Sequence, residues 1–329
     1  MKAIVQDGYG SLEVLALGEV NKPAVGEEDV LVRVHAAGLD QGVWHLMAGL
    51  PYLVRMMGFG LRAPKVPVRG TDVAGRVEAV GRSVTRLQPG DEAFGTCDGS
   101  FAEYGCARED RLAPKPANLT FEEAAAVPVS GCTALHGLRD KGEVRAGQRV
   151  LVIGAGGGVG TFAVQLAKAF GAEVTGVCST AKVDLVRSIG ADHAIDYTRE
   201  DFADARRPYD LILDTAGRRS LSHLRRALAP RGTLVIVGGE GGGRWLGGFQ
   251  RQILWAPALA LFVGQRLRGL TSTERREDLE LLTELIEGGR LTPAIDRTYP
   301  LSEVPEAIRY MRDGRVRGKI VITVLPAER

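Results

Sequence analysis

The residues best suited to chemistry lie in a glycine-rich turn at residues 150–160, which reads VLVIGAGGGVG. An apolar strand leads directly into a helix there, so the first backbone N–H groups of the helix would face an anion. Against a dinucleotide-binding fingerprint, Ala155 takes the first glycine position, Gly157 the second and Gly160 the third. The turn predicts a diphosphate site, with a purely structural turn as the alternative. The residues expected to contact the cofactor are Gly156, Gly157, Gly158, Val159 and Gly160.

The strand that follows this helix indicates which nucleotide binds. It ends at residues 177–180 without the acidic residue that would hold the ribose 2'-hydroxyl of NAD. Ser179 can donate to a 2'-phosphate and Lys182 can neutralise it, whereas a carboxylate would repel that group. These residues predict NADPH, the alternative for Lys182 being a solvated surface lysine.

Two patterns of hydrophobicity place this turn in the chain. The first 120 residues contain short alternating segments such as 30–36 and 74–80, which predict a β-rich region. From about Phe121, helical segments such as 160–170 alternate with unbroken apolar strands, which predicts a doubly wound parallel sheet covered on both faces. The predicted apolar strands are residues 150–154, 173–178, 209–217 and 232–239.

The tail of the chain contains no further strand–helix units of this kind. It predicts helices at 274–287 and 302–313 and strands at 295–300 and 319–324. We therefore expect the tail to return to the first domain. The expected domains are 1–122, the nucleotide-binding domain 123–271, and the returning segment 272–329.

Composition limits the partners of this protein. The chain has 329 residues with 42 basic and 40 acidic side chains, so no whole-chain field would attract nucleic acid or an anionic membrane. Neither partner is expected. The four scattered cysteines fit a reducing compartment, and no signal peptide is evident at the N-terminus, so a cytoplasmic protein is expected. The longest apolar run, residues 253–263, is well short of the roughly 20 residues needed to cross a bilayer.

Several motifs together resemble one superfamily. They are AGGGVG at 155–160, PGDEAFG at 89–95, SFAEY at 100–104, IGADHAIDY at 189–197 and GTLVIVGG at 232–239. With these motifs the chain resembles the medium-chain dehydrogenase/reductase superfamily and, within it, the zinc-free, zeta-crystallin-like quinone oxidoreductases. The resemblance covers nearly the whole chain.

This resemblance implies a fold, an assembly and a set of site residues. The fold is α/β, with a Rossmann doubly wound sheet inserted in a GroES-like β-rich catalytic domain, and relatives often form homodimers through the Rossmann sheets. The residues that resemble the family's 2'-phosphate site are Ser179, Lys182 and Tyr197, with Arg315 as a further candidate. Those that resemble the nicotinamide side are Thr133, Gly238 and Gly239.

The resemblance also suggests where a catalytic zinc would lie in related enzymes. The corresponding places here carry Asp40, the pair Thr71 and Asp72, and Val129, which is not a mixed Cys/His ligand set. Cys97 and Cys106 stand alone, with spacing unsuited to a structural zinc lobe. We therefore expect no bound metal.

Without a metal to polarise a substrate oxygen, the site suits an acceptor that already stabilises arriving electrons. A quinone or activated enone is such an acceptor, and NADPH would supply the hydride. Asp40 is the candidate for orienting the nicotinamide or substrate, with a structural hydrogen bond as the alternative, and Tyr52 is a candidate donor to the substrate oxygen. Cys132 has no paired base and is interpreted as a buried structural residue.

Three other functions remain open at this point. One is a zinc-free NADP-dependent alcohol dehydrogenase, which would need a strong acid or base at the carbonyl. A second is an NADPH-binding protein that contacts RNA or another protein, as the resemblance to crystallin-type reductases permits. A third is an enoyl reductase acting on carrier-bound substrates.

Overall fold

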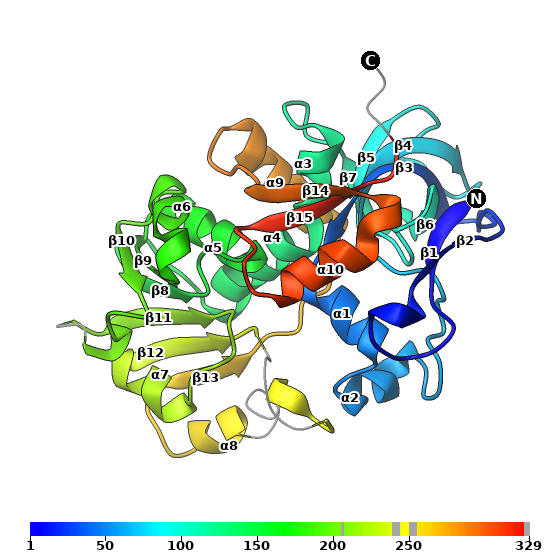
Figure 1. Ribbon diagram of the computed structural model, residues 1–329. Helices are drawn as coiled ribbons and strands as arrows, with labels where there is room; N and C mark the ends of the chain where they lie inside the picture. The colour runs from blue at the N-terminus through cyan, green and yellow to red at the C-terminus, as the bar shows by residue number, and fades with distance from the viewer. Residues whose placement is uncertain (205–206, 239–243, 250–254, 326–329) are drawn as a thin grey trace. The chain divides into compact units, whose positions relative to one another are not determined.

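The computed structural model describes residues 1–204, 207–238, 244–249 and 255–325 (Figure 1). The chain divides into two compact units, one formed by Met1–Cys132 with Glu274–Arg329 and the other by Thr133–Thr273. The first division lies later than the boundary near residue 122 that the sequence suggested. The reason is that helix α3 (Phe121–Ala125) packs on strands of the first unit.

A six-stranded sheet organises the unit Thr133–Thr273. Every neighbouring pair in it is parallel, and the strand order is β10-β9-β8-β11-β12-β13. Its strands are β8 (Arg149–Ile153), β9 (Glu173–Cys178), β10 (His193–Asp196), β11 (Tyr209–Asp214), β12 (Leu228–Ile236) and β13 (Arg266–Gly269). Its helices are α5 (Gly158–Ala169), α6 (Val183–Ser188), α7 (Leu221–Ala227) and α8 (Ala256–Ala260), while α4 (Pro128–Leu135) spans the division between the units.

This sheet confirms the predicted doubly wound architecture. The strand order reverses between β8 and β11, so right-handed crossovers put α5 and α6 on one face and α7 on the other. Figure 1 shows α5 and α6 side by side over β8 to β10. Burial on both faces explains the unbroken apolar strands, since Val150, Leu151 and Val152 are all fully buried. Ligands of such sheets bind where the strand order reverses, which here is at the carboxyl ends of β8 and β11.

A seven-stranded, mainly antiparallel sheet organises the other unit. Its order is β14-β15-β3-β4-β5-β7, with β6 also paired to β3. Its strands are β3 (Asp29–Leu39), β4 (Asp72–Val80), β5 (Glu92–Thr96), β6 (Tyr104–Arg108), β7 (Leu112–Pro114), β14 (Ile295–Pro300) and β15 (Lys319–Thr323), and a separate hairpin joins β1 (Lys2–Val5) to β2 (Ala16–Glu19). The remaining helices are α1 (Gln41–Ala48), α2 (Tyr52–Val54), α9 (Arg276–Glu287) and α10 (Val304–Arg312).

The tail of the chain joins this second sheet directly. Strand β15 runs antiparallel to β3 and pairs Ile320 with Leu39. Helix α9 is also attached to the first part of the chain, because Asn118 donates to the Ile286 carbonyl at 3.0 Å and the Ala117 N–H donates to Glu287 at 2.9 Å. No helix in the described part of the chain is long and apolar enough to span a bilayer.

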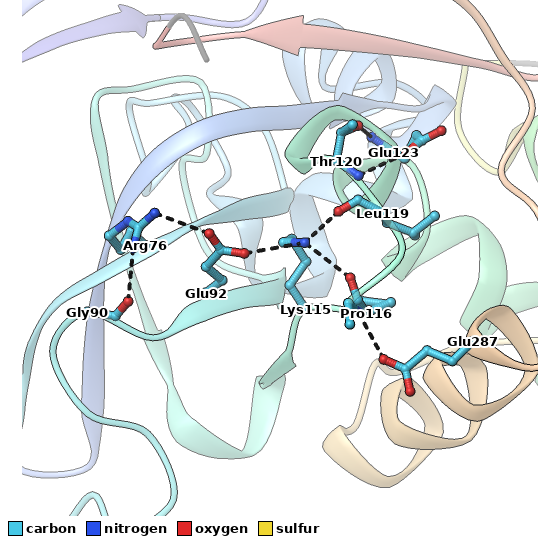
Figure 2. Close-up of polar contacts among 10 residues, drawn as sticks. Arg76, Gly90, Glu92, Lys115, Pro116, Leu119, Thr120, Glu123 and Glu287 are labelled. Carbon is cyan, nitrogen blue, oxygen red and sulfur yellow. Dashed lines mark hydrogen bonds and ion pairs between the residues drawn. The ribbon is translucent and has the colours of Figure 1, made fainter. Parts of the chain in front are cut away.

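A polar network holds the segment between β7 and α3 in place (Figure 2). The Lys115 ammonium reaches the Glu92 carboxylate at 3.4 Å and donates to the carbonyls of Pro116 and Leu119. Helix α3 then begins with a capping box, in which Thr120 and Glu123 each satisfy the other's backbone N–H. The network fixes the approach to α4, the helix in which the chain passes into the nucleotide-binding unit.

Candidate functional site

The glycine-rich turn connects β8 directly to α5, and its geometry depends on its glycines. Gly154 adopts φ +86°, a left-handed conformation that side chains disfavour. A Cβ on Gly160 would lie 2.1 Å from the Gly154 carbonyl oxygen, so helix and strand approach closely only because this residue is glycine. Gly157 precedes α5 and provides no capping side chain, which leaves the first N–H groups of the helix available to an anion. These features fit the diphosphate of a nicotinamide cofactor.

Lys182 lies beside this turn. A Cβ placed on Gly156 would be 2.8 Å from the Lys182 side chain, which puts the aliphatic part of the lysine against the glycines. Ser179 directly follows β9, and its hydroxyl makes no hydrogen bond among the described residues. The structure therefore brings Ser179, Lys182 and the turn to the same edge of the sheet.

One carboxylate at this edge, that of Asp196, was not anticipated as a site residue. Asp196 ends β10 directly beside Cys178 at the end of β9. Its oxygens accept hydrogen bonds from the Thr180 hydroxyl at 2.6 Å and from the N–H and hydroxyl of Thr198 at 3.0 and 2.8 Å. The hydrogen bond from Thr180 holds the pKa of Asp196 below its usual value, so the carboxylate stays charged but turned to these donors. The predicted residue Tyr197 follows it and is exposed.

The carboxyl ends of β11 and β12 are packed closely around Gly238. A Cβ on Gly238 would lie 2.3 Å from the Thr215 carbonyl oxygen, and the Gly238 N–H donates to the Asp214 carbonyl at 3.1 Å. Packing alone therefore requires a glycine at position 238, and its place beside the nicotinamide stays a prediction. The other predicted glycine, Gly239, lies outside the described residues.

Two further predicted cofactor residues lie elsewhere in the chain. Thr133 is a buried residue of α4. Arg315 belongs to the other unit, where it follows α10 and pairs with Asp313 at 2.5 Å. Their contacts with a cofactor stay predictions.

The two candidate catalytic residues lie near each other in sequence, on different helices. Asp40 caps the N-terminus of α1, and its Oδ1 accepts from the Val43 N–H at 3.3 Å. Its Oδ2 is buried and has no hydrogen-bond partner among the described residues. Tyr52 begins α2, and the Arg55 guanidinium lies 4.8 Å from the centre of its ring. Asp40 thus caps a helix with one oxygen and keeps its other oxygen without a hydrogen-bond partner among the described residues.

The places that correspond to zinc ligands in related enzymes are brought together by the fold. Asp72, at the start of β4, accepts from the Val129 N–H at 2.9 Å and from the Lys319 ammonium at 3.0 Å. Asp72 and Lys319 are both buried. Burial raises the pKa of Asp72 to about 6, although the Lys319 ammonium lowers it, and nearby Asp40 raises it further.

These residues do not fit a bound zinc ion. Val129 has no donor atom in its side chain, and the Asp72 carboxylate is already held by an ammonium group that would repel a metal cation. In the described part of the chain, no group of three or more His, Cys, Asp or Glu side chains could hold a metal. Cys132 is fully buried, in agreement with its interpretation as a structural residue.

Two of the residues described above were missed by sequence reasoning, and each left a signal. Lys319 opens the apolar strand KIVIT, where a charged side chain breaks the pattern and indicates a buried partner. Asp196 lies in the motif IGADHAIDY, but only the parallel pairing of β9 and β10 places it beside the end of β9. These signals show that Lys319 and Asp196 have partners, but the neighbouring residues do not show which distant segment provides them.

Comparisons with known proteins agree with the geometry of both units. Residues 26–117 match the alcohol dehydrogenase GroES-like domain family, and residues 189–322 match a family described as zinc-binding dehydrogenase. The chain is 35% identical over 341 residues to 2-methylene-furan-3-one reductase of Solanum lycopersicum, covering 99% of this chain and 80% of that protein. It is 33% identical to the chloroplastic NADPH-dependent alkenal/one oxidoreductase of Arabidopsis thaliana, with the same coverage of the two chains.

A solved structure shows the same similarity in three dimensions. The quinone oxidoreductase from Coxiella burnetii superposes with a TM-score of 0.84 at 29% identity, and the match covers 99% of each chain.

Proposed function

Because the chain belongs to the zinc-free quinone oxidoreductase family of the medium-chain dehydrogenase/reductase superfamily, we propose that it is an NADPH-dependent reductase of quinones or activated enones. The observation that carries this proposal is the buried Lys319 ammonium against Asp72, where zinc-dependent relatives keep a ligand. An ammonium cannot act as a Lewis acid on a substrate carbonyl. This arrangement favours an acceptor that stabilises the incoming electrons by itself, as conjugated carbonyl compounds do.

The preference for NADPH rests on the end of β9. When bound, the reduced cofactor would supply the hydride. Ser179 offers an uncommitted hydroxyl and Lys182 a positive charge to the 2'-phosphate, while Asp196 is already hydrogen-bonded to threonines. The N-terminus of α5 would hold the diphosphate.

The remaining roles belong to residues that would position the reacting groups. Gly238 would let the nicotinamide approach the backbone, and Thr133 would lie next to the nicotinamide ring. Asp40 would orient the nicotinamide or the substrate through its buried, unpartnered oxygen. Tyr52 would donate a hydrogen bond to the substrate oxygen, while the proton that completes the reduction would come from solvent.

The test follows nicotinamide absorbance in chelator-treated protein. NADPH or NADH is offered with a panel of quinones and enones, and NADP is offered with simple alcohols. We expect rapid NADPH oxidation that depends on the quinone or enone. Chelator-sensitive alcohol oxidation would favour the dehydrogenase instead, and cofactor binding without turnover of any acceptor would favour a binding protein. Turnover restricted to carrier-bound substrates would indicate an enoyl reductase.

Two expectations about assembly and location accompany this function. We propose a homodimer formed at β13, because this strand is an edge of its sheet and the neighbouring Leu261 and Phe262 are more than four-fifths exposed. Sedimentation velocity of wild type against a Leu261→Ser, Phe262→Ser variant tests it, and an unchanged mass would count against this interface.

We also propose a cytoplasmic location, which the unpaired cysteines support.

A further inference from the structure

The segment after α2 begins with the π-helical turn Arg55–Phe59 and continues as a loop, and it exposes a set of large apolar side chains to water. The apolar loop, residues 56–66, contains Met56 at 69% exposure, Met57 at 60% and Leu61 at 70%, with Phe59 and Val66 exposed as well. Single exposed apolar residues are common, but a group of five in one short segment marks an interaction surface.

The backbone of this loop is held firmly, so the exposure is built into the fold. The Tyr9 hydroxyl donates to the Gly60 carbonyl at 2.6 Å, and the Lys65 N–H donates to the Phe59 carbonyl at 2.9 Å. At the start of the loop, Arg55 donates to the Gly49 carbonyl at 2.8 Å. These bonds close the loop on itself and on the body of its unit, while the apolar side chains point outward.

The charged side chains along the chain from Gln41 to Thr71 are all basic. No Asp or Glu occurs from Gln41 to Thr71, although the whole chain contains 40 acidic residues. Arg62 and Lys65 are exposed within the loop, and neither pairs with a carboxylate among the described residues. Although the whole chain is nearly neutral, this segment is both basic and apolar.

We propose that the apolar loop docks this protein on the surface of an anionic lipid bilayer. The methionine, leucine and phenylalanine side chains would enter the boundary between headgroups and acyl chains, and Arg62 and Lys65 would lie against the phosphates. This departs from the expectation of no membrane partner, which rested on the net charge and on the absence of a membrane-spanning apolar run. It is independent of the proposed enzymatic activity, since docking needs neither cofactor nor turnover.

The basic residues favour a bilayer over a second copy of the chain as the occupant. In a two-fold symmetric contact the same surface meets itself, so Arg62 and Lys65 of one copy would face those of the other, and the segment 41–71 contains no carboxylate to separate them. An anionic bilayer instead complements both properties of the loop. Each basic side chain near such a surface strengthens binding by about fivefold.

The experiment is co-sedimentation of the full-length protein with vesicles of phosphatidylcholine alone or of phosphatidylcholine mixed with phosphatidylglycerol. The variants are Met56→Ser with Met57→Ser, and Arg62→Glu with Lys65→Glu. Matched controls in the same unit are Leu17→Ser, which removes an exposed apolar side chain elsewhere, and Arg86→Glu, which reverses an exposed charge. All substituted residues are exposed, and circular dichroism checks that each variant is folded.

We expect wild type to bind the mixed vesicles at least tenfold more tightly than the neutral ones, and added salt to weaken this binding. Each loop variant should lose at least tenfold in affinity for the mixed vesicles, while the two controls bind like wild type. Equal binding to both kinds of vesicle, or loop variants that bind like wild type, would overturn the proposal. A loop variant that alters the sedimentation mass without altering vesicle binding would assign the surface to a second copy.

Discussion

Lys319 Nζ lies 3.0 Å from Asp72 Oδ2, and both side chains are buried. The other Asp72 oxygen accepts from the Val129 N–H at the start of α4. A strand from the end of the chain is thereby tied to β4 and to the helix that carries Thr133. A buried ion pair of this kind adds little to the free energy of unfolding, but removing only one of its partners is strongly destabilising.

Lys319→Met leaves the Asp72 carboxylate buried without its cation. We expect the free energy of unfolding to fall by about 3–5 kcal/mol, measured by urea denaturation. The double variant Asp72→Asn, Lys319→Met should recover much of this loss because no buried charge is left. A Lys319→Met protein within about 1 kcal/mol of wild type would show that the pair is not buried in solution.

Asp72 should also give the stability a specific dependence on pH. Its pKa is raised from 3.8 to about 6 in the folded protein, so between these pH values the folded state holds a proton that the unfolded state has lost. The contribution of this group to stability is therefore present below pH 3.8 and is lost as the pH rises through about 6. The difference in free energy of unfolding between wild type and Asp72→Asn, measured by urea denaturation, should fall between pH 3.8 and about 6. A difference curve that is flat or rises there would contradict the assignment.

Lys182→Ala should weaken the use of NADPH selectively. We expect KM for NADPH to rise about tenfold or more, because a charge-assisted contact with the 2'-phosphate is lost. The KM for NADH and both kcat values should change little. Arg145→Ala, which removes an exposed charge from the same unit, serves as the matched control. Equal effects on NADPH and NADH would mean that Lys182 does not contact the 2'-phosphate.

Asp40 can be tested by separating its capping role from its charge. Asn caps helices as well as Asp does, so Asp40→Asn should leave stability within about 0.5 kcal/mol of wild type. If the second oxygen orients a reacting group, kcat should fall about tenfold, the effect of one lost hydrogen bond to a charged group. Asp40→Ala should cost about 1 kcal/mol of stability in addition. Full activity in Asp40→Asn would assign Asp40 to capping alone.

The elements of the nucleotide-binding unit were predictable because their signals are local. The apolar strands 150–154 and 173–178 were predicted within a few residues of β8 and β9. In the other unit, the helix 274–287 was predicted within a few residues of α9. The boundary near residue 122 differed from the division after Cys132. Helix α3 looks like the first helix of a new domain in sequence, but it packs on the sheet of the preceding one.

The candidate site divides in the same way. The sequence places Gly156 to Gly160, Ser179 and Lys182 at one edge of the sheet, because strand, turn and helix are consecutive along the chain. Their contacts with a cofactor stay predictions. The Lys319–Asp72 pair and the Asp196–Thr180 hydrogen bond were not found, because their partners meet through sheet pairing. Hydrophobic periodicity predicts that a strand exists but does not state which strand lies beside it.

By itself the sequence determined the α/β class, the family and the glycine-rich turn between β8 and α5, since each depends on residues that are neighbours along the chain. Only the tertiary structure decided that Asp72 is neutralised by a lysine 247 positions away and that five apolar side chains near Arg62 face the solvent. Burial and pairing between distant segments depend on how whole sheets assemble. Neither the net charge of +2 nor a run of apolar residues indicates which side chains are buried or which segments pair.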